Sequence, residues 1–194
     1  RAVYAQQVHS ADVRIAHAAD AQPPECEPRF ACDGFVTNEP GVPLAVFMAD
    51  CLPALLHDPA AGVIGAVHCG WRGSVADILG AAVAQMCALG AHPADIRAAI
   101  GPGIGACCFE VGPEVVAAAE ALLHEPLGAL VRPHADGKAL LDLKGVNALR
   151  LTQLGVPAEQ IAVSDACTMC RPDVFWSHRA TDGRRGVQAA VITL

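Results

Sequence analysis

The chain has 194 residues, of which 53% are hydrophobic, 17% charged and 4% aromatic. A mean hydropathy of +0.37 excludes a disordered chain, and this length suits one domain with its own core. The formal net charge of −7 argues against a broad nucleic-acid-binding face, and no apolar run approaches the roughly 18 residues of a membrane span. We therefore expect one domain over residues 1–194, with neither nucleic acid nor membrane as a partner.

In the first half, three short apolar runs predict buried strands. They cover Leu44–Ala49, Pro53–His57 and Gly62–Cys69. Before them, the Pro-rich stretch Gln22–Arg29 predicts a loop and Asp33-Gly34 a turn. After them we expect a turn at Gly70–Gly73, then a helix capped by Ser74 and ended by Gly90.

The second half continues the mixture of strands and helices. We expect strands at Arg97–Ile100, Ile161–Ser164 and Gly186–Leu194, helices at Pro113–Leu123 and Lys144–Leu154, and a glycine-rich loop at Gly101–Gly105. This order favours an α+β (mixed α/β) fold. The glycine-rich loop lacks the G-x-G-x-x-G phosphate-binding pattern.

Nine cysteines, an odd number, fall below the density of a disulfide scaffold. Several of them lie in apolar runs, and no signal peptide opens the chain. We therefore expect a reduced, cytoplasmic protein whose cysteines are core residues or ligands.

His9, Cys51 and His68 are the candidate metal ligands. Cys51 follows one predicted strand and His68 ends another, so neighbouring strands could bring them to one edge of a sheet. Two imidazoles and one thiolate suit zinc, and also copper, and three protein ligands leave a fourth position open, as in catalytic sites. The long spacings match no compact zinc motif, so burial of each residue in the core is the alternative.

Arg72 stands beside Trp71 between two glycines, where a strand ends and a helix begins. An arginine near free helix N–H groups suits a phosphate or carboxylate, whereas packing of Trp71 and a surface ion pair of Arg72 are the alternative. Arg179, Arg184 and Arg185 offer either anion contacts or ion pairs in the same way.

Four blocks of the sequence occur in an order that resembles a known family. They are QQVHSADV, DGFVTNEPGVPLAVFMADCLPALLHDP, VIGAVHCGWRGSV and AAIGPGIGACCFEVGPEV. Together they are similar to the laccase-domain proteins, formerly called multicopper polyphenol oxidases and now regarded as purine nucleoside phosphorylases. The resemblance covers nearly the whole chain.

This resemblance implies a central sandwich of mixed β-sheets flanked by helices. It implies one zinc ion held by His9, Cys51 and His68, which are also the expected catalytic residues. The implied activity is phosphorolysis of adenosine, inosine, guanosine and S-methyl-5'-thioadenosine, together with adenosine deamination. The partners are then a small-molecule nucleoside and phosphate, and we expect a monomer or homodimer. Family members usually carry a further segment ahead of the QVH motif, which this chain lacks.

The sequence leaves the roles of two further sets of residues undecided. Cys108 and Glu110 either contact the substrate, with Glu110 bonding a base or ribose hydroxyl, or are core sulfur and a solvated carboxylate. Cys167 and Cys170 form a Cys-x-x-Cys pair, but no second such pair completes a four-cysteine site, so we expect a structural role for it.

Three other functions compete with the phosphorylase. A copper-dependent polyphenol oxidase (laccase) would use the same ligands. However, several copper ions need many histidine ligands close together, and the eight histidines of this chain are scattered along the sequence. A metal-free thiol enzyme would use Cys51 as nucleophile and His68 as its base. A non-catalytic scaffold is the last alternative.

Overall fold

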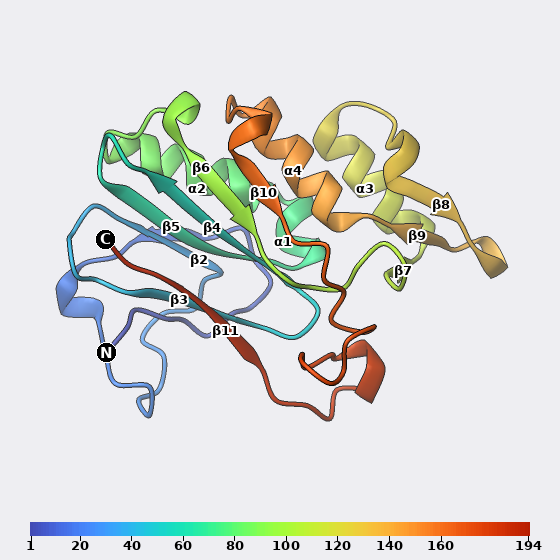
Figure 1. Ribbon diagram of the computed structural model, residues 1–194, viewed down its shortest axis with the longest axis horizontal. Coiled ribbons are helices and arrows are strands. Elements are labelled where there is room, and N and C mark those ends of the chain that lie inside the picture. Colours follow the sequence, from blue (N-terminus) through green and yellow to red (C-terminus); the bar gives the residue numbers. More distant parts are fainter.

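The computed structural model describes residues 1–194 and has a mixed sheet of six strands at its centre (Figure 1). Their order is β1-β2-β5-β4-β6-β10, with the bounds β1 (Val13–Ile15), β2 (Gly34–Thr37), β4 (Leu52–Asp58), β5 (Val63–Cys69), β6 (Arg97–Ile100) and β10 (Ile161–Val163). The outer pairs β1–β2 and β6–β10 are parallel, and the inner pairs are antiparallel.

A second sheet of two strands lies against one face of the central sheet (Figure 1). It pairs β3 (Leu44–Met48) antiparallel with the C-terminal strand β11 (Gln188–Ile192). A third sheet of β7 (Glu110–Val111), β9 (Ala139–Leu141) and β8 (Val131–Pro133) lies at one end of the molecule.

The helices lie on the other side of the central sheet (Figure 1). They are α1 (Trp71–Val75), α2 (Ile78–Ala88), α3 (Pro113–Leu123) and α4 (Leu143–Gln153). α2 packs on β5 and β2, and α4 packs on α2, α3 and β10. The predicted sandwich of mixed sheets flanked by helices is therefore confirmed. None of these helices combines the length and apolar character needed to cross a bilayer.

Burial on both faces explains the apolar run that predicted β5. Every residue of Val63–Cys69 is buried, because Val63 and Val67 face the core under the helices while Ile64 and Ala66 face the core under β3. A strand covered on both sides reads as a continuous apolar run rather than an alternating one.

The predicted turn at Gly70–Gly73 and the predicted cap at Ser74 are wrong. α1 already begins at Trp71 after Gly70, and the buried Ser74 hydroxyl has no hydrogen-bond partner. The helical stretch breaks at Asp77, whose left-handed backbone (φ 65°) starts α2 and whose carboxylate accepts from the Gly80 N–H.

Five short strands, β1, β2, β7, β8 and β9, were not predicted, because two to four residues carry too little periodicity. The predicted turn at Asp33-Gly34 is also wrong, since Gly34 is the first residue of β2. The strand at Arg97–Ile100 and the helix at Pro113–Leu123 were predicted with the bounds that the structure has.

Candidate active site

His9, Cys51 and His68 come together from three separate elements. His9 precedes β1, Cys51 lies between β3 and β4, and His68 lies near the end of β5. The antiparallel register places Pro53 opposite His68, so the start of β4 meets the end of β5. One ligand atom from each residue lies within 4.8 Å of the others, and Cys51 Sγ is 3.8 Å from His9 Nε2. These three side chains, called the His-Cys-His triad below, could hold one metal ion.

Asp33 organises the triad, although sequence reasoning had assigned it to a turn. Its buried carboxylate lies 2.8 Å from His68 Nδ1. It also accepts hydrogen bonds from the backbone N–H groups of Val8, His9 and Ser10, and from the Ser10 hydroxyl. With Nδ1–H donating to Asp33, the Nε2 atom of His68 is left as a ligand, the usual arrangement behind metal-bound histidines.

The same contacts shift the pKa values of Asp33, His68 and Cys51. Burial raises the pKa of Asp33, but hydrogen bonds from His68 and Ser10 outweigh it and bring that pKa to about 2. Burial lowers the pKa of His68, but Asp33 and Cys51 raise it to about 9. Burial raises the pKa of Cys51, but His68 and His9 lower it to about 7. Cys51 therefore forms the thiolate that metal binding or nucleophilic attack requires.

Gly70 gives the triad its space. A Cβ atom at this position would lie 2.9 Å from His9 Cδ2 and 3.1 Å from Cys51 Sγ. Any side chain would therefore push the two ligands, which explains a glycine directly after β5.

A hollow of about 300 Å³ opens beside the triad. Its lining includes His9 and Cys51, the aromatic rings of Trp71 and Phe109, and four basic side chains: Arg72, His178, Arg179 and Arg185. A second hollow of about 240 Å³ shares His9, Cys51 and Arg185 and continues to Phe47 and Val187. Aromatic walls with a few basic groups suit a small molecule that carries an anion and a flat ring.

None of the three arginines of the hollow pairs its guanidinium with a carboxylate. The guanidinium of Arg72 lies 4.4 Å from the centre of the Trp71 ring and makes no ion pair. Arg185 is half-buried; its guanidinium makes two long contacts, to the Gly186 carbonyl at 3.3 Å and to His178 Nδ1 at 3.4 Å, and its Nε–H has no acceptor. Arg179 donates twice from its guanidinium to the carbonyl of Glu110. Arg72 and the unpartnered Nε–H of Arg185 can therefore bind an anion in the hollow, whereas Arg184 does not line it.

Glu110 and Cys108 are not brought to the lining of either hollow. The Glu110 carboxylate lies 2.7 Å from Lys138 Nζ and 3.2 Å from His134 Nε2, and the Lys138 ammonium lowers the pKa of Glu110. Phe109, which stands between Cys108 and Glu110 in the sequence, lines the hollow of about 300 Å³ instead. The role of Glu110 and Cys108 in substrate binding stays a prediction.

Two further cysteines lie beside the Cys-x-x-Cys pair Cys167 and Cys170, although the sequence has no second Cys-x-x-Cys; the structural role expected for the pair stays a prediction. Adjacent residues Cys107 and Cys108 lie against this pair, and all four sulfur atoms lie within 4.8 Å of one another. This second pair is Cys-Cys rather than Cys-x-x-Cys and lies in another loop, so no local pattern in the sequence connects the two pairs.

The curated proteins similar to this chain include enzymes named for reactions on purine nucleosides. The chain is 38% identical over 197 residues to purine nucleoside phosphorylase YlmD of Geobacillus stearothermophilus, covering 99% of this chain and 72% of the relative. It is 42% identical over 147 residues to adenosine deaminase RL5 of an unknown prokaryotic organism, covering 76% of this chain and 56% of the relative.

A solved structure has the same fold. The crystal structure of Bacillus licheniformis hypothetical protein YfiH superimposes with a TM-score of 0.94 at 34% identity, covering 99% of this chain and 73% of that one. The chain thus spans between about half and three quarters of the length of these relatives. Residues 1–194 also match the family model described as multi-copper polyphenol oxidoreductase laccase, and the chain belongs to that family.

Proposed function

We propose that this chain is a zinc-dependent purine nucleoside phosphorylase that acts on adenosine, inosine, guanosine and S-methyl-5'-thioadenosine and also deaminates adenosine. The observation that carries the proposal is the His-Cys-His triad beside a hollow whose arginines, Arg72 and Arg185 among them, have no carboxylate partner. The relatives named purine nucleoside phosphorylase and adenosine deaminase support it. The nine free cysteines, with a thiolate among the ligands, favour a reducing compartment and hence the cytoplasm.

The residues of the triad fit zinc. Two imidazole nitrogens and one thiolate are a common zinc donor set, and three protein ligands leave one position open. Asp33 behind His68 supplies the carboxylate that usually orients such a histidine. When bound, zinc would supply Lewis acidity next to the hollow.

In phosphorolysis, an oxygen of phosphate forms a bond to the anomeric carbon of the sugar as the bond from that carbon to the purine nitrogen breaks. The purine leaves with the bonding electron pair and is then protonated. Arg185 and Arg72 would bind the phosphate through charge-assisted hydrogen bonds. The same bonds would orient one phosphate oxygen toward the anomeric carbon. Trp71 and Phe109 would pack against the flat base or the sugar.

Two other functions use the same residues. A polyphenol oxidase with several coppers needs many histidine ligands, but only His9 and His68, of eight histidines, belong to a group that could share an ion. A thiol enzyme is favoured by the pKa of about 7 for Cys51. Loss of activity on chelation and its return with zinc supports the metal enzyme; full activity in chelator and inactivation by a thiol alkylator supports the thiol enzyme.

The direct test is incubation of the purified protein with adenosine, with and without inorganic phosphate. We expect adenine and ribose 1-phosphate only when phosphate is present, and inosine as the product of deamination. Adenine release at the same rate without phosphate would identify a hydrolase instead. A chain that releases no purine but consumes oxygen with a phenol after copper loading would contradict the proposal in favour of the oxidase.

Arg185 offers a sharper test of phosphate binding. We expect Arg185→Ala to raise the KM for phosphate by about tenfold or more, because a desolvated guanidinium–phosphate contact contributes roughly 1.5–3 kcal/mol. Steady-state kinetics at saturating inosine measures this change. Arg184→Ala is the matched control, since Arg184 is exposed and outside the hollow. Equal phosphate KM values in the two variants would exclude Arg185 from the anion site.

A further inference from the structure

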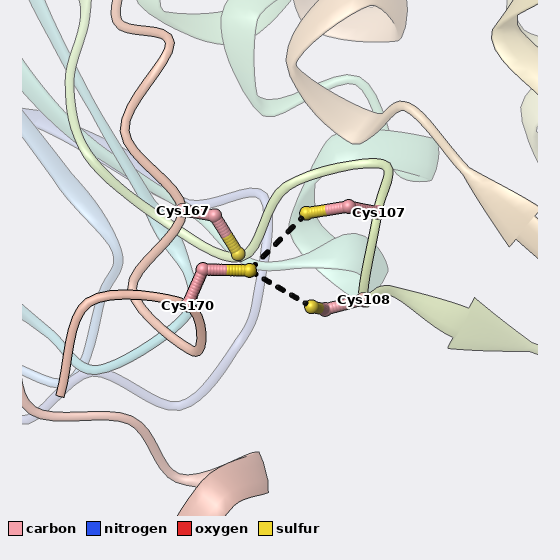
Figure 2. A group of neighbouring side chains, drawn as sticks. All are labelled: Cys107, Cys108, Cys167 and Cys170. Carbon is pink, nitrogen blue, oxygen red and sulfur yellow. Dashed lines mark hydrogen bonds between the residues drawn. The ribbon is translucent and has the colours of Figure 1, made fainter.

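Four cysteines outside the triad form a compact cluster, here called the four-cysteine cluster: Cys107, Cys108, Cys167 and Cys170 (Figure 2). Cys170 Sγ lies 3.6 Å from Cys107 Sγ and 3.4 Å from Cys108 Sγ. One pair follows β6 and the other follows β10. β6 and β10 are parallel neighbours, so the loops after them leave the same edge of the sheet and meet there.

We propose that the four-cysteine cluster binds one zinc ion as a tetrahedral tetrathiolate site, separate from the His-Cys-His triad. Zinc–sulfur bonds of about 2.3 Å give a tetrahedron with sulfur–sulfur edges of about 3.8 Å. The four sulfur atoms lie within 4.8 Å of one another, so the loops already place them close to the sulfur–sulfur distances of such a tetrahedron. An iron–sulfur cluster would need a wider opening, because several iron and sulfide atoms lie between its cysteines.

The backbone around the cluster is built for close-packed thiolates. The Gly105 N–H donates to Cys167 Sγ at 3.2 Å, a contact that stabilises a metal-bound thiolate. A Cβ atom on Gly105 would lie 3.1 Å from Cys167 Cβ and 3.3 Å from Cys107 Sγ, so glycine lets the two loops approach.

A buried lysine of α4 contacts the segment that leads to Cys167. Lys144 Nζ donates to the carbonyls of Ser164 and Ala166, at 2.8 and 2.7 Å. Its positive charge beside Cys167 offsets part of the negative charge that four thiolates and one divalent ion would carry together.

The cluster is tied to the triad through Asp50. Thr168, inside the Cys-x-x-Cys, donates from its hydroxyl to Asp50 Oδ1 at 2.6 Å, and the Arg179 backbone N–H donates to Asp50 Oδ2 at 2.7 Å. Asp50 directly precedes Cys51 and has a left-handed backbone with φ 85°. An ion at the cluster would therefore fix a segment that also fixes the approach to Cys51.

The segment 164–187 has little regular structure of its own. Between β10 and β11 it contains only one 3₁₀ turn, at Arg179–Thr181, yet it supplies Arg179 and Arg185 to the hollow. A closed four-ligand zinc site is a common way to hold such a segment in place. The expected role of the second ion is therefore structural.

Zinc content of purified variants tests the proposal. We expect about two zinc ions per chain in the wild type, one in Cys51→Ala and one in Cys170→Ser. In Cys51→Ala, X-ray absorption should show the remaining zinc with four sulfur neighbours at about 2.3 Å. Cys87→Ser is the matched control, because Cys87 is exposed on α2, and it should keep the wild-type content.

Three results would overturn the proposal. They are a Cys170→Ser variant with the zinc content of the wild type, nitrogen or oxygen neighbours around the zinc in Cys51→Ala, and disulfides in place of zinc at the cluster. Because these measurements do not depend on turnover, failure here is distinct from failure of the proposed activity.

Proteolysis gives a second measurement, in case serine at residue 170 disturbs folding. We expect trypsin to cut after Arg179 or Arg184 about tenfold faster in Cys170→Ser than in Cys87→Ser, since local opening governs cleavage. Cadmium NMR of the wild-type chain needs no variant. A resonance in the tetrathiolate range supports the site, and its absence in cadmium-loaded protein contradicts it.

Discussion

Replacement of Cys51 by alanine is expected to abolish zinc binding at the triad and to lower kcat/KM for inosine phosphorolysis by about a thousandfold or more. The thiolate is the only sulfur ligand of the triad, and two imidazoles alone bind zinc weakly. Cys51 Sγ also forms a hydrogen bond with His9 Nε2, so the substitution removes a contact that holds the His9 ring in position. Metal analysis and the rate of hypoxanthine release measure the two effects on the same sample.

The control for this variant is Cys87→Ala, because Cys87 is exposed on α2 and belongs to neither the triad nor the lining of the hollows. It should retain wild-type zinc content and rate. Hypoxanthine release by Cys51→Ala at the wild-type rate would remove the proposed role of the triad, whatever the zinc content of the protein.

Replacement of Asp33 by asparagine is expected to weaken zinc binding at the triad by about 10–100-fold. An amide offers one oxygen where the carboxylate offers two, and its NH₂ group would face donors from the His68 ring or from the segment Val8–Ser10. Since Asp33 is buried, the same substitution should lower the free energy of unfolding by about 2–4 kcal/mol. Competition with a chelating dye and urea denaturation measure the two quantities.

Asp12→Asn is the matched control, because Asp12 is a nearby exposed carboxylate whose side chain accepts no hydrogen bond in the structure. It should change neither quantity. An Asp33→Asn variant that is destabilised but binds zinc with wild-type affinity would make Asp33 a purely structural residue and contradict the positioning role.

The C-terminal strand explains how a distant part of the chain reaches the triad. β11 pairs with β3 from Gln188 opposite Met48, and β3 ends just before Cys51. This register brings Arg185, three residues before Gln188, to the hollows beside the triad. The segment 164–187 is thus anchored at two places. Thr168 and Arg179 donate hydrogen bonds to Asp50, and the pairing of β11 with β3 begins directly after the segment.

The sequence by itself determined the buried strands, the longer helices and the mixed fold. Leu44–Met48 and Val63–Cys69 are apolar because both faces of these strands are covered, and Pro113–Leu123 carries its own helix start signal. The residue types of the triad and the four motif blocks indicated a metal-dependent enzyme of this family, because ligand chemistry belongs to the residues themselves.

Only the tertiary structure decided which residues share a site. Asp33 resembles a turn residue until the pairing of β2 with β5 brings it under His68. Glu110 lies beside Lys138, which directly precedes β9, and Cys107 and Cys108 meet Cys167 and Cys170 only because β6 and β10 are neighbours. Local patterns record the period and burial of each element, but contacts between distant residues depend on strand order and register, which no short window of sequence contains.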